Sequence, residues 1–145
     1  MPTVQAELFI PKPPAEVYAA AKDLEGLKPY LKDVESLKVL EHSAERSKSD
    51  WVAVAMGKKV HWVEDEEWFD AELRNQFSSA QGDFDKYQGS WNFKPEGEGT
   101  RVTLDLEYEL NIPIFGGILQ KLILKLMKEN CEGLLQGLKE RCLTA

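Results

Sequence analysis

DFDKYQGSWNFKPEGEGTRVTLDLEYEL, residues 83–110, is the stretch that decides the fold. Apolar and polar side chains alternate on both sides of a glycine-rich segment at residues 96–99, which is the pattern of two long antiparallel strands joined by a turn. A long amphipathic segment follows and runs almost to the C-terminus. Two long strands followed by one long helix indicate a curved sheet that packs around the helix, an arrangement that can leave an apolar cavity between the two.

The residues before this stretch predict further strands and two short helices. A first strand is predicted at residues 3–10, and three prolines end it. Two short helices follow at residues 15–24 and 27–32, the first beginning beside Pro14, whose missing N–H would be unpaired there anyway. Six strands are then predicted at residues 36–42, 50–56, 59–69, 72–79, 86–94 and 101–111. Polar or glycine-containing turns are expected at 45–49, 57–58 and 96–99, and such short connections indicate an antiparallel meander in an α+β fold.

The closing helix is predicted at residues 117–143 and has a clear apolar face. That face carries Leu119, Ile123, Leu126, Met127, Asn130, Leu134 and Leu138. The opposite face carries Lys121, Lys125, Lys128, Glu132 and Lys139. Two glycines near the edge of the apolar face, Gly133 and Gly137, either make room for a ligand or allow close packing. Ile118, Leu122 and Leu124 extend the apolar surface, which the loop at 111–115, a partner subunit or a lipid surface could cover.

Length and composition favour one globular domain spanning residues 1–145. The net charge of -7 and the lack of a basic stripe argue against direct binding of nucleic acid. The first ten residues show no signal pattern, and no apolar run approaches the roughly 20 residues of a membrane span. Cys131 and Cys142 fall in one helix about 16 Å apart, so they cannot pair, and no metal-ligand spacing is present. These features predict a cytoplasmic protein with reduced thiols and no metal or cofactor.

Three stretches resemble the START / Bet v 1-like (SRPBCC) helix-grip superfamily, in its polyketide cyclase and coenzyme-Q-binding branch. They are the first strand with PPAEVYAAAKDLEGLKPYL at 13–31, then GSWNFKPEGEGTRVTLDLEYEL at 89–110, and the long closing helix. The likeness covers nearly the whole chain. It implies a helix-grip fold: a curved antiparallel sheet of about six or seven strands around a long C-terminal helix, with two short helices after the first strand.

The resemblance also implies a hydrophobic cavity between the concave face of the sheet and the last helix. Members of this superfamily bind lipids, sterols, quinones, polyketides or hormones, and some catalyse cyclisation or dehydration. Other members associate with ribosomal components, which leaves a protein partner open. No catalytic signature of the family can be matched to this chain residue by residue.

Ten residues are predicted to line the cavity. They are Trp91, Phe93, Leu104, Leu106, Tyr108, Ile123, Leu126, Met127, Asn130 and Leu134. Tyr108 shares the inward face of its strand with apolar residues, and Asn130 is the strongly polar residue of the helix's apolar face. Both could orient a ligand by hydrogen bonding, although a buried tyrosine or asparagine also often bonds a nearby protein group.

The strand at 59–69, KVHWVEDEEWF, places acidic side chains on both of its faces. Glu64 and Glu66 share one face with tryptophans, while Asp65 shares the other with His61. Our interpretation favours acids on a solvated outer face; an inward carboxyl would have a raised pKa and could act as an acid or base. His61 and Asp65 lie about 13 Å apart along a strand, too far for a catalytic dyad. Arg74 is expected to face water, since burial without a partner would be costly.

Three classes of function follow. The leading hypothesis is a carrier that binds a hydrophobic or amphipathic small molecule. Transient contact between the Lys-rich end of the closing helix and a membrane surface is a further hypothesis. The second is an enzyme of the polyketide cyclase or dehydratase type, which an inward Glu64, Asp65, Glu66 or Arg74 would favour. The third is a protein-interaction module with a filled core, marked by a small or absent pocket together with an exposed apolar patch near Ile118 and Leu122.

Overall fold

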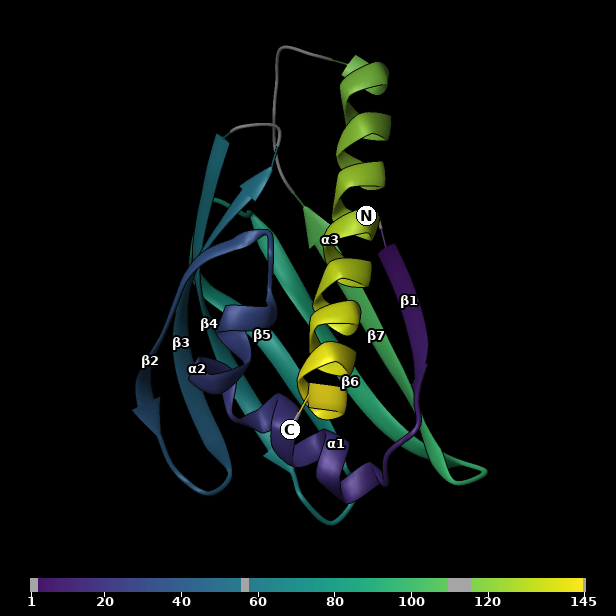
Figure 1. The fold of residues 1–145 in the computed structure, drawn as a ribbon. Helices are drawn as coiled ribbons and strands as arrows, with labels where there is room; N and C mark the ends of the chain where they lie inside the picture. Colours follow the sequence, from purple (N-terminus) through teal and green to yellow (C-terminus); the bar gives the residue numbers. More distant parts are fainter. Residues whose placement is uncertain (1–2, 56–57, 110–115, 145) are drawn as a thin grey trace.

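The computed structural model describes residues 3–55, 58–109 and 116–144 as one antiparallel sheet of seven strands with helices on its inner side (Figure 1). The strand order is β1-β7-β6-β5-β4-β3-β2, so that every neighbouring pair except β1 and β7 is consecutive in the chain. The strands are β1 (Thr3–Ile10), β2 (Val34–His42), β3 (Arg46–Ala55), β4 (Lys58–Phe69), β5 (Arg74–Gly82), β6 (Lys86–Glu96) and β7 (Gly99–Glu109). The helices are α1 (Pro14–Lys22), α2 (Leu24–Leu27), the short 3₁₀ helix η1 (Lys28–Tyr30) and α3 (Gly116–Thr144).

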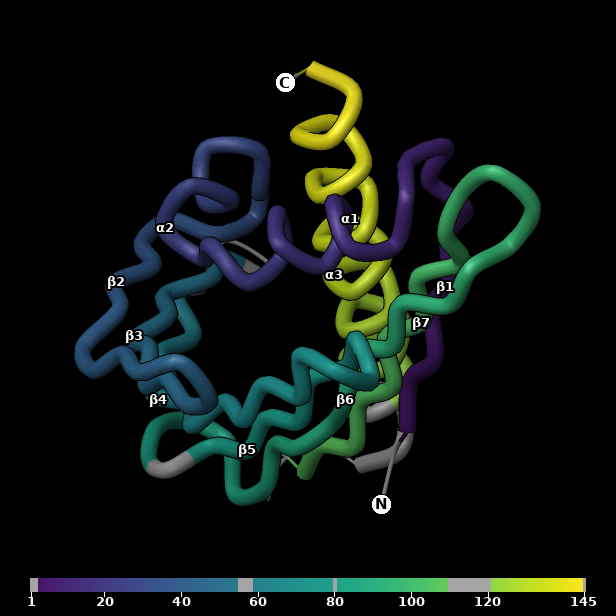
Figure 2. The backbone as a smooth tube through the Cα atoms, turned by 90° about the horizontal axis from the view of Figure 1, so that it is seen from below, coloured from purple at the N-terminus to yellow at the C-terminus, as the bar shows by residue number. Residues whose placement is uncertain are grey.

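The sheet bends around α3. Seen from one end, the strands form an arc from β2 through β5 to β1, α3 lies inside the arc beside β1 and β7, and α1 and α2 lie across its open side (Figure 2). Consistent with this view, α3 packs mainly on β1 and α1, and α2 packs on β2. This architecture is the helix-grip fold that the sequence predicted, including the two short helices after the first strand.

The sequence predicted all seven strands, but it was wrong about residues 45–49, which were expected to form a turn. The turn comes earlier: Ser43 N donates to Arg46 O at 2.8 Å, and β3 then begins at Arg46. The segment looked like a turn because it contains no apolar side chain. Its serines are nevertheless ladder residues, since Ser47 pairs with Glu66 and Ser49 pairs with Glu64.

Alternation along the strands decides which side chains form the core. On β7, the predicted inward residues from Val102 to Tyr108 are all buried, while the intervening residues are partly exposed. On α3 the buried row is Ile123, Met127, Cys131, Leu135, Leu138 and Cys142. Leu126, Asn130 and Leu134 lie beside this row and are half-buried. The buried face is thus rotated about the helix axis relative to the predicted one, although both faces include Ile123, Met127 and Leu138. The rotation arises because α3 rests on β1 and α1 rather than on the middle of the sheet.

Gly137 allows α3 to approach η1 closely. A Cβ atom at this position would lie 2.5 Å from Tyr30 O, so the glycine serves packing here. Gly133 is less crowded, with the nearest atom, Asp33 Oδ2, 3.5 Å from such a Cβ. Leu110, the loop at 111–115 and the side chains of Ile118 and Leu119 lie outside the described residues.

Candidate functional site

A cluster of polar side chains lies on the inner face of β3 and β4. The strand register places Ser47 opposite Glu66, Ser49 opposite Glu64, and Trp51 opposite Trp62. Because alternate residues of a strand share a face, all of these side chains point to the interior together with Trp68. Glu64 is 6% exposed and Glu66 is 3% exposed, so two carboxyl groups are buried side by side in the core.

Glu66 receives hydrogen bonds from two serine hydroxyls. Ser47 Oγ donates to Glu66 Oε1 at 2.7 Å, and Ser49 Oγ donates to Glu66 Oε2. Trp68 Nε1 donates to Ser47 Oγ at 2.9 Å and Trp51 Nε1 donates to Ser49 Oγ at 2.8 Å, because an indole N–H can only donate. Two chains of donors, each running from a tryptophan through a serine, therefore converge on Glu66.

Glu64 lies in a different environment, and its carboxyl group is favoured in the neutral form. Burial raises the pKa of Glu64 well above its usual value. The charge of Glu66 and a hydrogen bond with Glu66 raise this pKa further, whereas the hydrogen bond from the indole N–H of Trp62 lowers it. That N–H donates to Glu64 Oε1 at 2.9 Å. The pair thus combines Glu66, whose two oxygens accept from serines, with Glu64, whose pKa is raised by burial and by its neighbour.

The structure corrects the interpretation that the acids of residues 59–69 lie on a solvated outer face. Glu64 and Glu66 point inward, and only Asp65 and Glu67 of this segment carry partly exposed carboxylates on the other side. The sequence contained the information needed to assign the inward face. Trp62 and Trp68 occupy alternate positions of the strand with Glu64 and Glu66, so all four side chains share one face, and two tryptophans indicate that this face points inward. The serines of β3 were missed because the segment was read as a turn.

Two small cavities border the carboxyl pair between the sheet and α3. One has a volume of about 20 Å³ and is lined by Trp51, Glu64, Phe77, Tyr87, Trp91, Leu104, Leu106, Cys131 and Leu134. The other has a volume of about 30 Å³ and is lined by Ala21, Leu24, Leu27, Trp51, Glu64, Glu66, Trp68, Asn75, Trp91 and Leu134. Each has room for about one water molecule, well below the roughly 300 Å³ at which pockets for drug-sized ligands begin.

Asn75 contributes a buried acceptor to the second cavity. The residue is 2% exposed, and its Oδ1 atom has no hydrogen-bond partner within the part of the chain that the structure describes. It lies between Trp68 of β4 and Trp91 of β6 in the ladder, on the same inner face as the glutamates. A buried carbonyl oxygen without a partner costs free energy, roughly 1–3 kcal/mol, unless a bound molecule satisfies it.

The ten residues predicted to line the cavity occupy three kinds of position. Trp91, Leu104, Leu106 and Leu134 border the two cavities. Phe93, Tyr108, Ile123 and Met127 are buried in the surrounding core. Leu126 and Asn130 are half-buried on α3. Their contact with a ligand stays a prediction.

Tyr108 was expected to offer a hydroxyl to a ligand. The side chain is fully buried, and its hydroxyl has no partner among the described residues, but it lines neither cavity. Burial raises the pKa of the Tyr108 hydroxyl.

Other candidate residues lie outside this site. Arg74 is partly exposed as expected, and its Nε donates to Glu72 Oε2 at 2.8 Å. His61 does not contact Asp65; its Nε2 lies 2.9 Å from Asp50 Oδ1 on the neighbouring strand, on the outer face. Cys131 and Cys142 are free and buried, and burial raises the pKa of the Cys131 thiol to about 12.

Among the described residues no group of three His, Cys, Asp or Glu side chains is placed to hold a metal ion. None of the described helices combines the length and the hydrophobicity that a membrane span requires.

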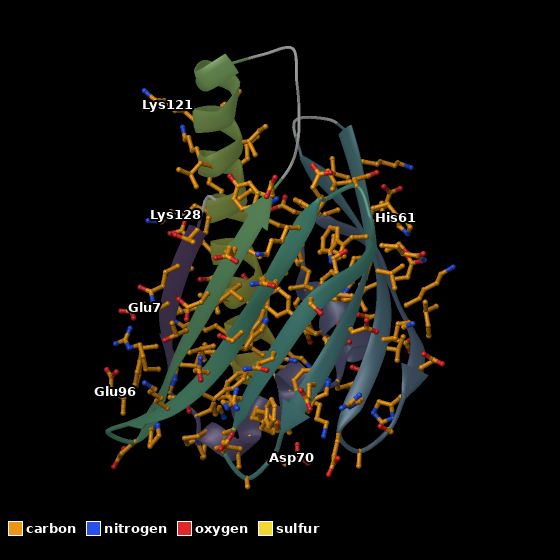
Figure 3. All side chains as sticks on the ribbon, turned by 180° about the vertical axis from the view of Figure 1, so that it is seen from behind. Glu7, His61, Asp70, Glu96, Lys121 and Lys128 are labelled. Atoms are coloured by element: carbon orange, nitrogen blue, oxygen red, sulfur yellow. The ribbon has the colours of Figure 1, made fainter. Side chains whose placement is uncertain are left out.

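The outer face of the sheet is polar and shallowly hollowed. A depression of about 910 Å³ is lined by side chains such as Gln5, Asp65, Gln76, Gln88 and Asp105. Figure 3 shows this face, with His61 at one side and Lys121 and Lys128 on the helix behind it. Leu122 and Leu124 are each 40% exposed at the same end of α3, which projects past β1 and β7 in Figure 1. Most of the side chains that line the depression are polar or charged.

Comparison with known proteins supports the helix-grip assignment. The family described as polyketide cyclase / dehydrase and lipid transport matches residues 10–135. The protein TTHA0849 from Thermus thermophilus is 65% identical, covers 99% of this chain and 98% of its own, and superposes with a TM-score of 0.97. No curated protein matches.

Two distant structures share the fold alone. The Zhui aromatase/cyclase from a Streptomyces species is 12% identical over 97% of this chain and 93% of its own, with a TM-score of 0.89. A START superfamily protein from Mycobacterium smegmatis is 18% identical over 98% of this chain and 97% of its own, with a TM-score of 0.82.

Proposed function

The chain belongs to the polyketide cyclase / dehydrase and lipid transport family, and we propose that it binds a hydrophobic or amphipathic small molecule between the sheet and α3. The apolar body of the ligand would lie against Trp91, Leu104 and Leu134. Its polar end would lie at Glu64 and Asn75. The observation that carries this proposal is Asn75, which lines a cavity together with two buried carboxyl groups and whose Oδ1 has no partner among the described residues.

A purely structural role would leave this interior unexplained. Burying two carboxyl groups costs several kcal/mol per charge before compensation, and apolar side chains of similar volume would fill the space at no such cost. Serines and tryptophans compensate Glu66, while Asn75 keeps an unsatisfied acceptor. Retaining such groups around unfilled space is typical of a binding site, where a few polar groups orient a ligand within apolar walls.

The cavity must widen to admit a ligand. Leu134 and Trp91, which border both cavities, are half-buried, so each has a side open to movement. In this proposal α3 shifts away from β4 and β5, where it makes fewer contacts than with β1, and the two cavities merge. The bound conformation is thus more open than the one described here.

An enzymatic function is the second candidate, and one observation favours it. Glu64 faces the cavity with a raised pKa beside the carboxylate of Glu66, the arrangement in which a carboxyl group donates a proton near neutral pH. A dehydration or cyclisation needs such a proton donor at a carbonyl or hydroxyl oxygen. The resemblance to the aromatase/cyclase fold is compatible with this chemistry but does not select it.

Native mass spectrometry of the protein purified from its expression host tests the binding proposal, followed by solvent extraction of any bound molecule. We expect a stoichiometric adduct of a hydrophobic compound, or else a thermal shift with members of a panel of lipids, quinones and aromatic polyketides. A protein without adduct that responds to no member of the panel would contradict the proposal. It would favour the filled-core interaction module, whose two marks the described residues already show: the interior cavities are small, and Leu122 and Leu124 are exposed.

A matched pair of variants locates the binding. Leu134→Trp adds a ring where both cavities meet and is expected to abolish uptake, while Leu143→Trp adds the same ring at a half-exposed position of the same helix and is expected to leave uptake unchanged. Circular dichroism of both variants checks that the fold is kept. Equal uptake by the two variants would place the ligand elsewhere.

A further inference from the structure

We infer that the ligand carries a positively charged amine, which lies between Glu64, Glu66 and Asn75 against the tryptophan side chains of the cavity. This inference deepens the proposed function, on which it rests, by naming the chemical class of the ligand's polar end.

The first reason is a pair of buried acidic side chains without a basic partner. Both oxygens of Glu66 accept hydrogen bonds from serines, and no ion pair among the described residues involves Glu66 or Glu64. The other titratable groups that act on Glu64 or share its cavities are Asp65, Tyr87 and Cys131, and none of them is a cation. A buried charge without a counter-ion is costly, so a cationic ligand would bind more strongly here than a neutral one.

The second reason is an unsatisfied acceptor in the wall. The indole N–H groups of Trp51, Trp62 and Trp68 are already used on Ser49, Glu64 and Ser47. Asn75 Oδ1, buried and without a partner in the described structure, is an acceptor that faces the same cavity. An ammonium group has three N–H donors and no acceptor, which matches this set of oxygens.

The third reason is the aromatic surrounding. Trp51, Trp68 and Trp91 line the cavity that contains both carboxyl groups. Aromatic side chains attract cations through their ring faces, most strongly when the cation is removed from water. The described structure places one cation, Lys22, beside these rings, with its Nζ atom 6.0 Å from the ring of Trp68. Asp70, whose Oδ1 lies 3.0 Å from this Nζ, holds it outside the cavity. It leaves the carboxyl groups free for a ligand.

Isothermal titration with three probes of one shape tests the inference at neutral pH. Phenethylamine, phenethyl alcohol and hydrocinnamate share a phenylethyl body and differ in a positive, neutral or negative end. We expect phenethylamine to bind about tenfold more tightly than phenethyl alcohol, and hydrocinnamate to bind most weakly. In Glu66→Gln the preference for the amine over the alcohol is expected to disappear.

The control is Asp65→Asn, which removes one negative charge from the adjacent position on the opposite face of β4. It should keep the preference for the amine, and thermal unfolding should show both variants folded. An alcohol that binds as well as the amine would overturn the inference and leave the proposed function standing. Binding of Mg²⁺ or Ca²⁺ alone in competition with phenethylamine would also overturn it, in favour of a metal site. If no probe binds and the purified protein carries no adduct, both proposals fail.

Discussion

The two halves of the sheet bury different kinds of side chain. Around β1, β7 and α3 the interior is apolar, with Ile10, Val102, Leu104, Leu135 and Leu138 almost entirely removed from solvent. Around β3, β4 and β5 the interior contains the polar residues Ser47, Ser49, Glu64, Glu66 and Asn75. The first half holds the helix in place, and the second half provides groups that a ligand or a reaction can use. Stability and chemistry are thus assigned to opposite ends of one sheet.

The largest effect is expected in the apolar half. Leu138→Ala removes a fully buried side chain from α3 and should lower the free energy of unfolding by about 3 kcal/mol, the sum of lost burial and a cavity. Urea denaturation measures the loss. Leu143→Ala, on the same helix but 50% exposed, should cost less than about 0.5 kcal/mol. Similar losses for the two variants would mean that the packing of α3 differs from that described.

The next effect concerns the polar half and depends on pH. Because the pKa of Glu64 is raised above its usual 4.5, the folded state holds this proton to a higher pH than the unfolded chain does. The stabilising contribution is complete below that usual value and is lost as pH rises through the folded pKa. Wild type should therefore lose stability relative to Glu64→Gln above about pH 5, by at most about 1.4 kcal/mol per pH unit.

Urea denaturation of both proteins between about pH 5 and 8 measures this difference in slope. Asp65→Asn, which alters an outward carboxylate on the same strand, should follow the wild-type slope. Parallel curves for wild type and Glu64→Gln would show that Glu64 is ionised across this range.

A smaller effect of opposite sign is expected at Asn75. Asn75→Leu removes a buried oxygen that has no partner among the described residues, replaces the amide with an apolar side chain of similar shape, and should raise the free energy of unfolding of the ligand-free protein by about 1 kcal/mol. The same change should weaken ligand binding. Gln76→Leu, on the exposed face of β5, is the matched control and should change neither. A destabilised Asn75→Leu protein would show that the amide has a structural role in the interior.

The smallest effect is expected at Lys48, which lies between the two inward serines of β3 but faces outward. Its Nζ atom lies 3.8 Å from Glu41 Oε2 and 3.9 Å from Asp65 Oδ1, distances typical of weak surface ion pairs. Lys48→Ala should change the free energy of unfolding by less than about 0.5 kcal/mol in thermal or urea denaturation. Ser49→Ala should lower the free energy of unfolding by more, because it removes the hydrogen bond from Ser49 to Glu66. Equal costs would remove the distinction between the two faces of β3.

The contrast between the halves also explains what the sequence could predict. Alternation of apolar and polar residues identified β1, β6 and β7 and the inward face of β7, because burial there coincides with hydrophobicity. The same rule failed on β3, where inward Ser47 and Ser49 resemble a turn, and gave the wrong face for the acids of β4. Those side chains are buried because hydrogen bonds across strands satisfy them, and that information appears only when the register is known.

The inward placement of the tryptophan side chains has a practical consequence. All four tryptophans of the chain lie on the inner face, and Trp51 stacks on Trp62 with ring centroids 5.6 Å apart. Three of them are buried and Trp91 is half-buried beside the cavities, so their emission reports mainly on the interior, and the exciton signal of the stacked pair comes from two buried rings. The protein therefore carries built-in chromophores through which an optical titration, without any added label, can follow entry of a molecule into its interior.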